Sequence, residues 1–330
     1  MAGIAAGSAF AQVSFSGEVH AGIELRNAPP PVEGDRDTSI TTTHREYGAP
    51  KFDFTATVMR ENYGARLDTT FQSTANPQEH FTLNGIYGWV TLLDNSLRLT
   101  MGQISTPAWV TRLDGRLIEH RLDEITGFRV EYATPIQGLS VGAAFRSEGG
   151  DVQRFGEQMI FGANFLHPLF SAVFAYDLAS NGQAIFGINF TGISDLTAGL
   201  QLRANNLASW ANELLYFGML QMHQKVGYRI TRDIFVYLIT GQGIFGTPHL
   251  DTFLEFTPGI DYRITPNLTG IFRMTIDSPD GFSTTNLMLR PSIEYTLRGP
   301  AILYAEYELR LDNMDRATHT FGFGITIRAF

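Results

Sequence analysis

The sequence predicts an all-β fold, a transmembrane antiparallel β-barrel of eighteen strands, and three observations support this prediction. Apolar and polar residues alternate with a period of two over segments long enough to cross a bilayer. Short turns alternate with longer connections along the whole chain. No run approaches the ~20 consecutive apolar residues that a membrane-spanning helix needs.

The alternation is clearest from Val13 to Arg26. In this segment the large apolar side chains occupy odd positions and the charged side chains occupy even positions. Successive side chains of a strand point to opposite faces, so one face of this strand is apolar and the other is ionic. The segment is longer than the five or six residues of a typical strand, and a tilted membrane strand needs ~9–11. The same pattern recurs in residues 51–58, 253–264, 286–297 and 320–328.

Eight short turns and nine longer segments connect the predicted strands, which gives eighteen strands, with sixteen as the alternative if one hairpin is misassigned. Pro, Gly, Asn and Asp supply the turn geometries. The short turns, expected on the periplasmic side, are residues 61–63, 94–96, 135–138, 166–169, 192–195, 231–233, 265–267 and 298–300. The longer segments, expected outside, are residues 27–50, 76–80, 106–126, 147–157, 179–182, 205–212, 243–251, 278–283 and 312–317.

Composition is compatible with a barrel and excludes several other classes. The 330 residues are 44% hydrophobic with a mean hydropathy of −0.04, as expected if every second strand residue faces water. The net charge is −9 and no basic patch is present, so nucleic acid is not an expected partner. Cysteine is absent, which removes thiol catalysis and thiolate metal sites and agrees with passage through an oxidising envelope.

The first eleven residues resemble the end of an export signal. Ala2 to Ala11 is small and apolar, and it closes with Ala9-Phe10-Ala11 before Gln12, an A-x-A cleavage pattern. A charged n-region is missing, so we interpret residues 1–11 as the remnant of a signal peptide. An ordinary flexible terminus is the alternative. Residues 12–330 then form a single barrel domain, because no domain break interrupts the pattern.

Aromatic residues gather where the apolar face meets the short turns. We expect them to form an interfacial girdle, with the rings in the apolar band and the hydroxyls among the lipid headgroups. The general preference of strands for aromatic residues is the alternative explanation. The residues in question are Tyr63, Phe165, Phe170, Tyr228, Tyr262 and Tyr295.

Residues 127–141 resemble the strand–turn–strand that follows the constriction loop of Gram-negative general porins. The elements that carry the resemblance are Tyr132-Ala133-Thr134-Pro135 and Gly138-Leu139, and residues 97–103 resemble the strand that leads into that loop. The chain also ends in Phe330, as porin-like barrels do. The resemblance departs from the family in its strand count, since general porins have sixteen strands and the substrate-specific channels have eighteen. Phe330 is also one residue out of phase with the apolar face of its strand.

This resemblance implies a location and a function. The expected location is the bacterial outer membrane, reached by export through the periplasm, with recognition of Phe330 by the outer-membrane assembly machinery. The expected function is passive diffusion of small hydrophilic solutes and ions through a water-filled lumen. Outer-membrane lipid and the solutes are the expected partners. The resemblance to porins also implies a homotrimer.

Many of the strand residues that face the predicted lumen are ionic. Charges facing water are cheap, and they create a transverse field that sorts ions. Ion pairs that only strengthen the wall are the alternative. The pore-wall residues singled out are Glu18, Arg66, Arg98, Arg129, Glu131, Arg263, Arg273 and Arg290.

By the same resemblance, residues 106–126 form a loop folded into the pore, and an ordinary external loop is the alternative. The segment holds four acids, three arginines and a histidine. This near balance predicts no strong ion selectivity. The expected constriction residues are Arg112, Asp114, Arg116, Glu119, Arg121, Asp123 and Glu124.

Other classes of function find little support. No nucleophile elbow or HExxH motif is present, and the eight histidines lack metal-ligand spacing, so we expect neither an enzyme nor a cofactor. A substrate-specific channel should carry aromatic rungs in its lumen, for which Phe253 and Tyr304 are the only candidates. A structural or adhesive surface barrel should have long loops, and most segments here are short.

Overall fold

The computed structural model describes residues 11–29, 37–43, 49–73, 81–104, 109, 125–147, 159–178, 182–190, 193–205, 220–246, 250–279, 283–297, 300–313 and 316–329. These residues form nineteen strands. They are β1 (Gln12–Ala28), β2 (Asp37–Thr43), β3 (Lys51–Arg60), β4 (Tyr63–Gln72), β5 (Phe81–Leu92), β6 (Leu97–Ile104), β7 (Ile125–Ala133), β8 (Leu139–Arg146), β9 (Met159–Leu166), β10 (Phe170–Asp177), β11 (Gln183–Phe190), β12 (Leu196–Asn205), β13 (Leu220–Arg229), β14 (Ile234–Gly246), β15 (Leu250–Thr265), β16 (Leu268–Ser278), β17 (Asn286–Thr296), β18 (Ala301–Asp312) and β19 (Arg316–Ala329). None of the described residues forms a helix long and apolar enough to cross a membrane.

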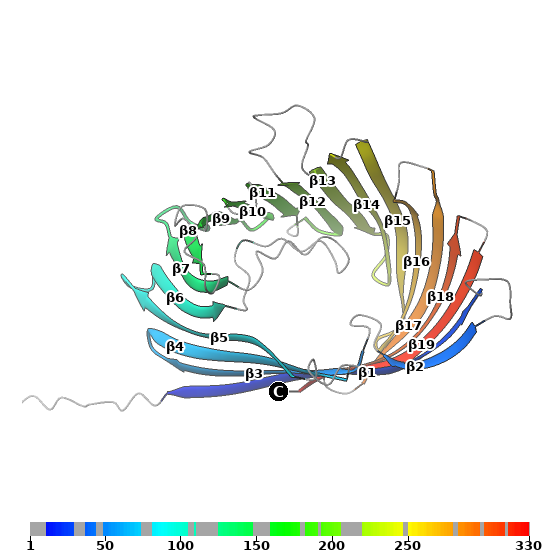
Figure 1. The fold of residues 1–330 in the computed structure, drawn as a ribbon, viewed down its shortest axis with the longest axis horizontal. Helices are drawn as coiled ribbons and strands as arrows, with labels where there is room; N and C mark the ends of the chain where they lie inside the picture. Colours follow the sequence, from blue (N-terminus) through cyan, green and yellow to red (C-terminus); the bar gives the residue numbers. More distant parts are fainter. Residues whose placement is uncertain are drawn as a thin grey trace, which may run out of the picture.

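The strands form one closed antiparallel sheet (Figure 1). The first and last strands close it, because β1 pairs with β19 from Gly17↔Ala329 to Asn27↔His319. The other edge of β1 is shared by two strands: Gly22–Ala28 pairs with β2 and Gln12–His20 pairs with β3. β2 and β3 therefore occupy one position in the wall, and the barrel has eighteen strand positions. The predicted count of eighteen is confirmed.

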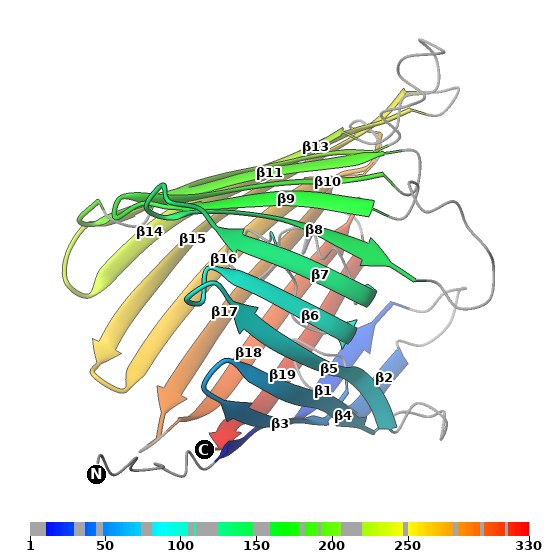
Figure 2. The ribbon, with the colours of Figure 1, turned by 90° about the vertical axis from the view of Figure 1, so that its left-hand side faces the viewer.

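The short connections all lie at one end of the barrel. Figure 2 shows them at the same end as the start of β1 and the end of β19, with the strands tilted across the wall. Each of the eight predicted short turns falls between two consecutive paired strands. In the turn between β5 and β6, Leu93, Asp94 and Asn95 all adopt a positive φ.

The predicted longer segments need three adjustments. Residues 27–50 are not one loop, because β1 continues to Ala28 and β2 lies within them. The segment 243–251 is shorter than expected, since β14 reaches Gly246 and β15 begins at Leu250. The segment 205–212 is longer, since β13 begins at Leu220. In all three places the alternation of apolar and polar residues is weak, so it does not locate the end of the strand.

The apolar phase of each strand faces outward, as the alternation predicts. Half-exposed rings and branched side chains cover the outer surface, among them Phe15, Phe174, Phe186, Ile293 and Phe323. In water such a surface would be a severe aggregation hazard, whereas lipid tails cover it without cost. The opposite phase carries the ion pairs described below.

The predicted girdle tyrosines lie on this outer face at the end with the short turns. Tyr63 begins β4, and Tyr228, Tyr262 and Tyr295 lie near the ends of β13, β15 and β17. Their side chains are 42–53% exposed, which suits rings that reach the headgroup region. Phe165 of β9 and Phe170 of β10 pack together beside the turn between these strands, with 5.7 Å between ring centroids.

The barrel begins one residue after the predicted cleavage pattern. β1 starts at Gln12, and residues 1–10 lie outside the described residues. The signal remnant therefore stays a prediction. Phe330 also lies outside the described residues, whereas its neighbour Ala329 ends β19.

Candidate functional site: the inner wall of the barrel

Ion pairs between residues two apart on one strand recur on the inner wall of the described residues. Residues i and i+2 lie on the same face, so a cation and a carboxylate at this spacing meet directly. The Lys51 Nζ lies 2.8 Å from Asp53 Oδ2, and the Arg66 Nε lies 2.8 Å from Asp68 Oδ2. The same arrangement joins Arg129 to Glu131 at 3.1 Å and Arg310 to Asp312 at 2.7 Å.

Other ion pairs join neighbouring strands. At the closure of the barrel, Arg328 of β19 donates to Glu18 of β1 with 2.9 Å between Nε and Oε1. Farther along the wall, Arg290 of β17 donates to Glu308 of β18 at 2.9 Å. The Nε of Arg290 also lies 3.6 Å from Glu306 Oε1, so one guanidinium faces two carboxylates.

The predicted pore-wall residues therefore divide into two groups. Five of them, namely Glu18, Arg66, Arg129, Glu131 and Arg290, belong to the ion pairs above. The other three have different surroundings. Arg98 stacks on the Trp89 ring, 4.9 Å from its centroid, Arg273 donates to the Tyr237 hydroxyl at 2.7 Å, and Arg263 is exposed near the turn after β15.

Sequence reasoning missed Lys225 of β13 and Tyr237 of β14, which are buried on the inner face of the wall. Lys225 is 4% exposed, and its Nζ lies 5.2 Å from the centroid of the Tyr237 ring. Asp261 interacts electrostatically with both Lys225 and Arg273. The alternation of apolar and polar residues in β13 could have revealed Lys225. It is interrupted, however, because the polar residue Gln224 stands at an outward position where an apolar residue is expected.

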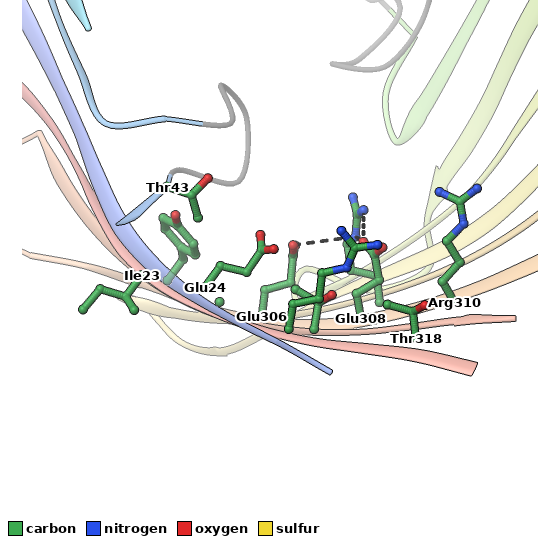
Figure 3. Close-up of a pocket in the computed structure, with 12 residues that line it drawn as sticks. Ile23, Glu24, Thr43, Glu306, Glu308, Arg310 and Thr318 are labelled. Atoms are coloured by element: carbon green, nitrogen blue, oxygen red, sulfur yellow. Dashed lines mark hydrogen bonds and ion pairs between the residues drawn. The ribbon is translucent and has the colours of Figure 1, made fainter. Parts of the chain in front are cut away.

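A hollow in the inner wall lies beside the closure of the barrel, where β1, β2, β17, β18 and β19 meet (Figure 3). Its volume is about 290 Å³. Gly322 contributes to it, because a Cβ at this position would meet nothing within 4 Å. The charged side chains that line it are Glu24, Arg26, Arg290, Glu306, Glu308 and Arg310. Acids and arginines are equal in number there, so the hollow presents both signs of charge to a solute.

The expected constriction residues, from Arg112 to Glu124, lie outside the described residues. Within the predicted segment 106–126 the structure describes Trp109 and the first two residues of β7. Trp109 is 2% exposed and packs on the inner face of the wall, where a Cβ on Gly162 would lie 2.0 Å from its Cδ2 atom. Within the described residues, no three His, Asp or Glu side chains are grouped so that they could hold a metal ion.

The architecture matches known channels. Solved structures of outer-membrane channels match the fold over nearly the whole chain. The chain has the fold of the outer-membrane channels. OccK11 (OpdR) of Pseudomonas aeruginosa matches with a TM-score of 0.61 and 13% identity over 96% of each chain. OpdK of the same organism, solved with vanillate, matches with a TM-score of 0.61 and 12% identity over 96% of this chain and 98% of that one.

A third channel with this fold is DcaP of Acinetobacter baumannii. It matches with a TM-score of 0.54 and 12% identity over 98% of both chains. No protein-family model matches the sequence, and no curated protein sequence matches it either. The likeness therefore lies in the fold.

Proposed function

We propose that this protein is an outer-membrane channel through which small hydrophilic solutes and ions diffuse passively. One observation supports this most strongly: apolar side chains cover the outside of a closed barrel, and ion pairs line much of its inside. In hydrocarbon every backbone polar group needs a partner, and a closed barrel provides them all. An ionic inner wall favours a hydrated path over a dry core.

The test is electrical. Purified protein inserted into a planar bilayer should produce stepwise current increases in potassium chloride. Neutral polyethylene glycols of increasing size should lower the conductance until they no longer enter the lumen. Membranes that stay silent after insertion, verified by protection from protease, would exclude an open channel.

A substrate-selective channel is a second candidate. The observation in its favour is the hollow beside Gly322, where acids and arginines stand together on the wall. OpdK, which has the same fold, was solved with vanillate. Saturable transport of one solute class in proteoliposomes would favour this candidate, whereas rates that depend only on solute size would favour a general channel.

We further propose that residues 106–126 form the narrowest part of the lumen. The packing of Trp109 on the inner face of the wall supports this, because Trp109 belongs to this segment and its own side chain lies inside the barrel. In this proposal the lining groups are Arg112, Asp114, Arg116, Glu119, Arg121, Asp123 and Glu124. Wall charges near the same level would come from Arg98, Arg129 and Glu131.

Neutralising the four acids of this segment tests the proposal. The variant Asp114→Asn/Glu119→Gln/Asp123→Asn/Glu124→Gln should shift the reversal potential in a salt gradient toward anion preference, because arginines then dominate locally. The shift should shrink at 1 M salt, where the Debye length is about 3 Å. Unchanged conductance and selectivity would place these side chains away from the ion path.

Export, assembly and oligomeric state complete the proposal. Residues 1–11 would be the remnant of an export signal, and Phe330 would be recognised by the outer-membrane assembly machinery. A homotrimer is the proposed assembly. Mass spectrometry of the exported protein, deletion of Phe330 and chemical cross-linking in membranes test these three points separately.

A further inference from the structure

An apolar patch interrupts the ionic inner wall on strands β8 to β11. Gly142, Gly162, Ala175 and Ile185 lie side by side across these strands, as their pairing shows. Ala144 and Ile160 extend the patch by one more pair. We call these six residues the inner apolar patch. Such a surface is not expected in a water-filled lumen, since the inner walls of channels are polar.

The inner apolar patch is covered. Ile160 is 0% exposed, and Ala144, Ala175 and Ile185 are each 1% exposed, although all of them face the inside of the barrel. The side chain of Trp109 packs against them in one hydrophobic cluster and is itself 2% exposed. The ring lies directly over the two glycines, because a Cβ would lie 2.0 Å from it at Gly162 and 2.8 Å from it at Gly142.

The backbone at Trp109 gives a second, independent observation. Its φ is +56°, the left-handed region that bulky side chains rarely adopt. Such a conformation persists where surrounding contacts offset its cost. The contacts at this position are those of the indole ring with the inner apolar patch. The ring and the patch are therefore both apolar and in close contact, and the left-handed backbone at Trp109 allows this contact.

We propose that Trp109 is a positioning residue for the pore: its indole binds the inner apolar patch and thereby fixes the chain at position 109 to the wall. The two glycines form a recess that the indole ring fills, and Ile160 and Ile185 belong to the same hydrophobic cluster as the ring. Because the indole fills the recess, the inner wall has a fixed shape at the inner apolar patch. The proposal rests on the proposed channel function for its electrical test but not for its spectroscopic test.

The spectroscopic test follows the ring itself. Trp109 is made the single tryptophan by the changes Trp89→Phe and Trp210→Phe, and acrylamide quenching is measured in lipid vesicles. Quenching should be weak in this background and should rise several-fold after Gly162→Leu, since the new side chain occupies the recess. The matched control is Gly322→Ala on the same inner wall, which has open space around its Cβ and should leave quenching unchanged. Equal quenching with and without Gly162→Leu would overturn the packing of the ring on the patch.

The electrical test follows the consequence. Trp109→Ala and Gly162→Leu should change single-channel current in the same way, with more open-channel noise and altered conductance, because either change leaves the ring undocked. Free indole should not restore the wild-type current in Trp109→Ala, because an indole that fills the recess is not joined to the chain. Restoration would show that filling the recess, and not holding the chain, sets the current. Wild-type current in both variants, together with a quenching result that shows the ring displaced, would overturn the positioning role. A silent wild type would instead contradict the proposed channel, while the quenching result would still decide whether the ring is docked.

Discussion

Two neighbouring residues halfway along β19 offer a sharp test of the fold. Phe323 faces outward and is 51% exposed, and Gly322 faces the lumen with nothing within 4 Å of its Cβ position. Either residue can be replaced by arginine. Phe323→Arg places the charge in lipid near the midplane, at a cost of ~2–4 kcal/mol. Loss of the ring adds to this cost, and Phe323→Leu measures that part.

Gly322→Arg places the same charge among partners. In the strand pairing Gly322 lies opposite Glu24 on one side and opposite Glu306 on the other. Each partly exposed pair of this kind contributes on the order of 0.2–1 kcal/mol, and replacing glycine within a strand gains a further ~0.5–1 kcal/mol. Gly322 is not among the glycines with a positive φ, so arginine can adopt its backbone. We therefore expect Gly322→Arg to be neutral or slightly stabilising.

The assay is urea titration of the protein refolded in lipid vesicles, followed by tryptophan fluorescence. The unfolding free energy of Phe323→Arg should be at least about 2 kcal/mol lower than that of Gly322→Arg. A slip of one residue in register exchanges the two faces of a strand. The reverse order, or equal losses, would therefore refute the assignment of the inner and outer faces.

Three further changes test the wall charges. Arg290→Gln should shift the reversal potential toward cation preference, because Glu306 and Glu308 lose the guanidinium between them; an unchanged potential would show that these carboxylates do not act on the ion path. Asp68→Asn should lower the unfolding free energy in urea by about 1–3 kcal/mol, since Asp68 is nearly buried and accepts hydrogen bonds from Arg66 and Thr55, and a loss below experimental error would contradict that network. Arg328→Gln should cost no more than about 1 kcal/mol in the same assay, because the pair that it forms with Glu18 is largely exposed.

The strand pattern and the turns could be predicted because each follows from local chemistry. The period of two in β1 requires only that one face meets lipid and the other water, so Val13 to Arg26 identifies both faces without any knowledge of the partner strands. β2 could not be predicted in this way. Its residues Asp37–Thr43 are mostly threonine, serine and aspartate, and their place in the wall is decided by pairing with β1. Composition resembles a loop there, and only the tertiary partner makes it a strand.

The site was predictable in its charges but not in its contacts. Alternation placed Arg129 and Glu131 on the inner face, and their spacing of two makes them neighbours on that face. The contact of Trp109 with Gly162 joins residues more than fifty positions apart across a closed barrel, and no local signal announces it. Glycines in a strand pattern do suggest close approach of another group, which is the sequence feature that indicates such a recess.

The direction of the ion pairs bears on how such a wall treats a solute. Pairs at i and i+2, such as Arg66 with Asp68 and Lys51 with Asp53, lie along a strand and cancel within a few ångströms. Their fields are short-ranged, and salt at physiological strength screens what remains beyond about 8 Å. A solute near such a wall meets alternating charges rather than one strong sign. Among the described wall residues, strong selectivity would therefore have to arise where charges lack this cancellation: at Arg98, which stacks on Trp89, or where Arg290 faces two carboxylates beside the hollow at Gly322. Ion preference should thus respond far more to changes at those two places than to the removal of any whole i, i+2 pair.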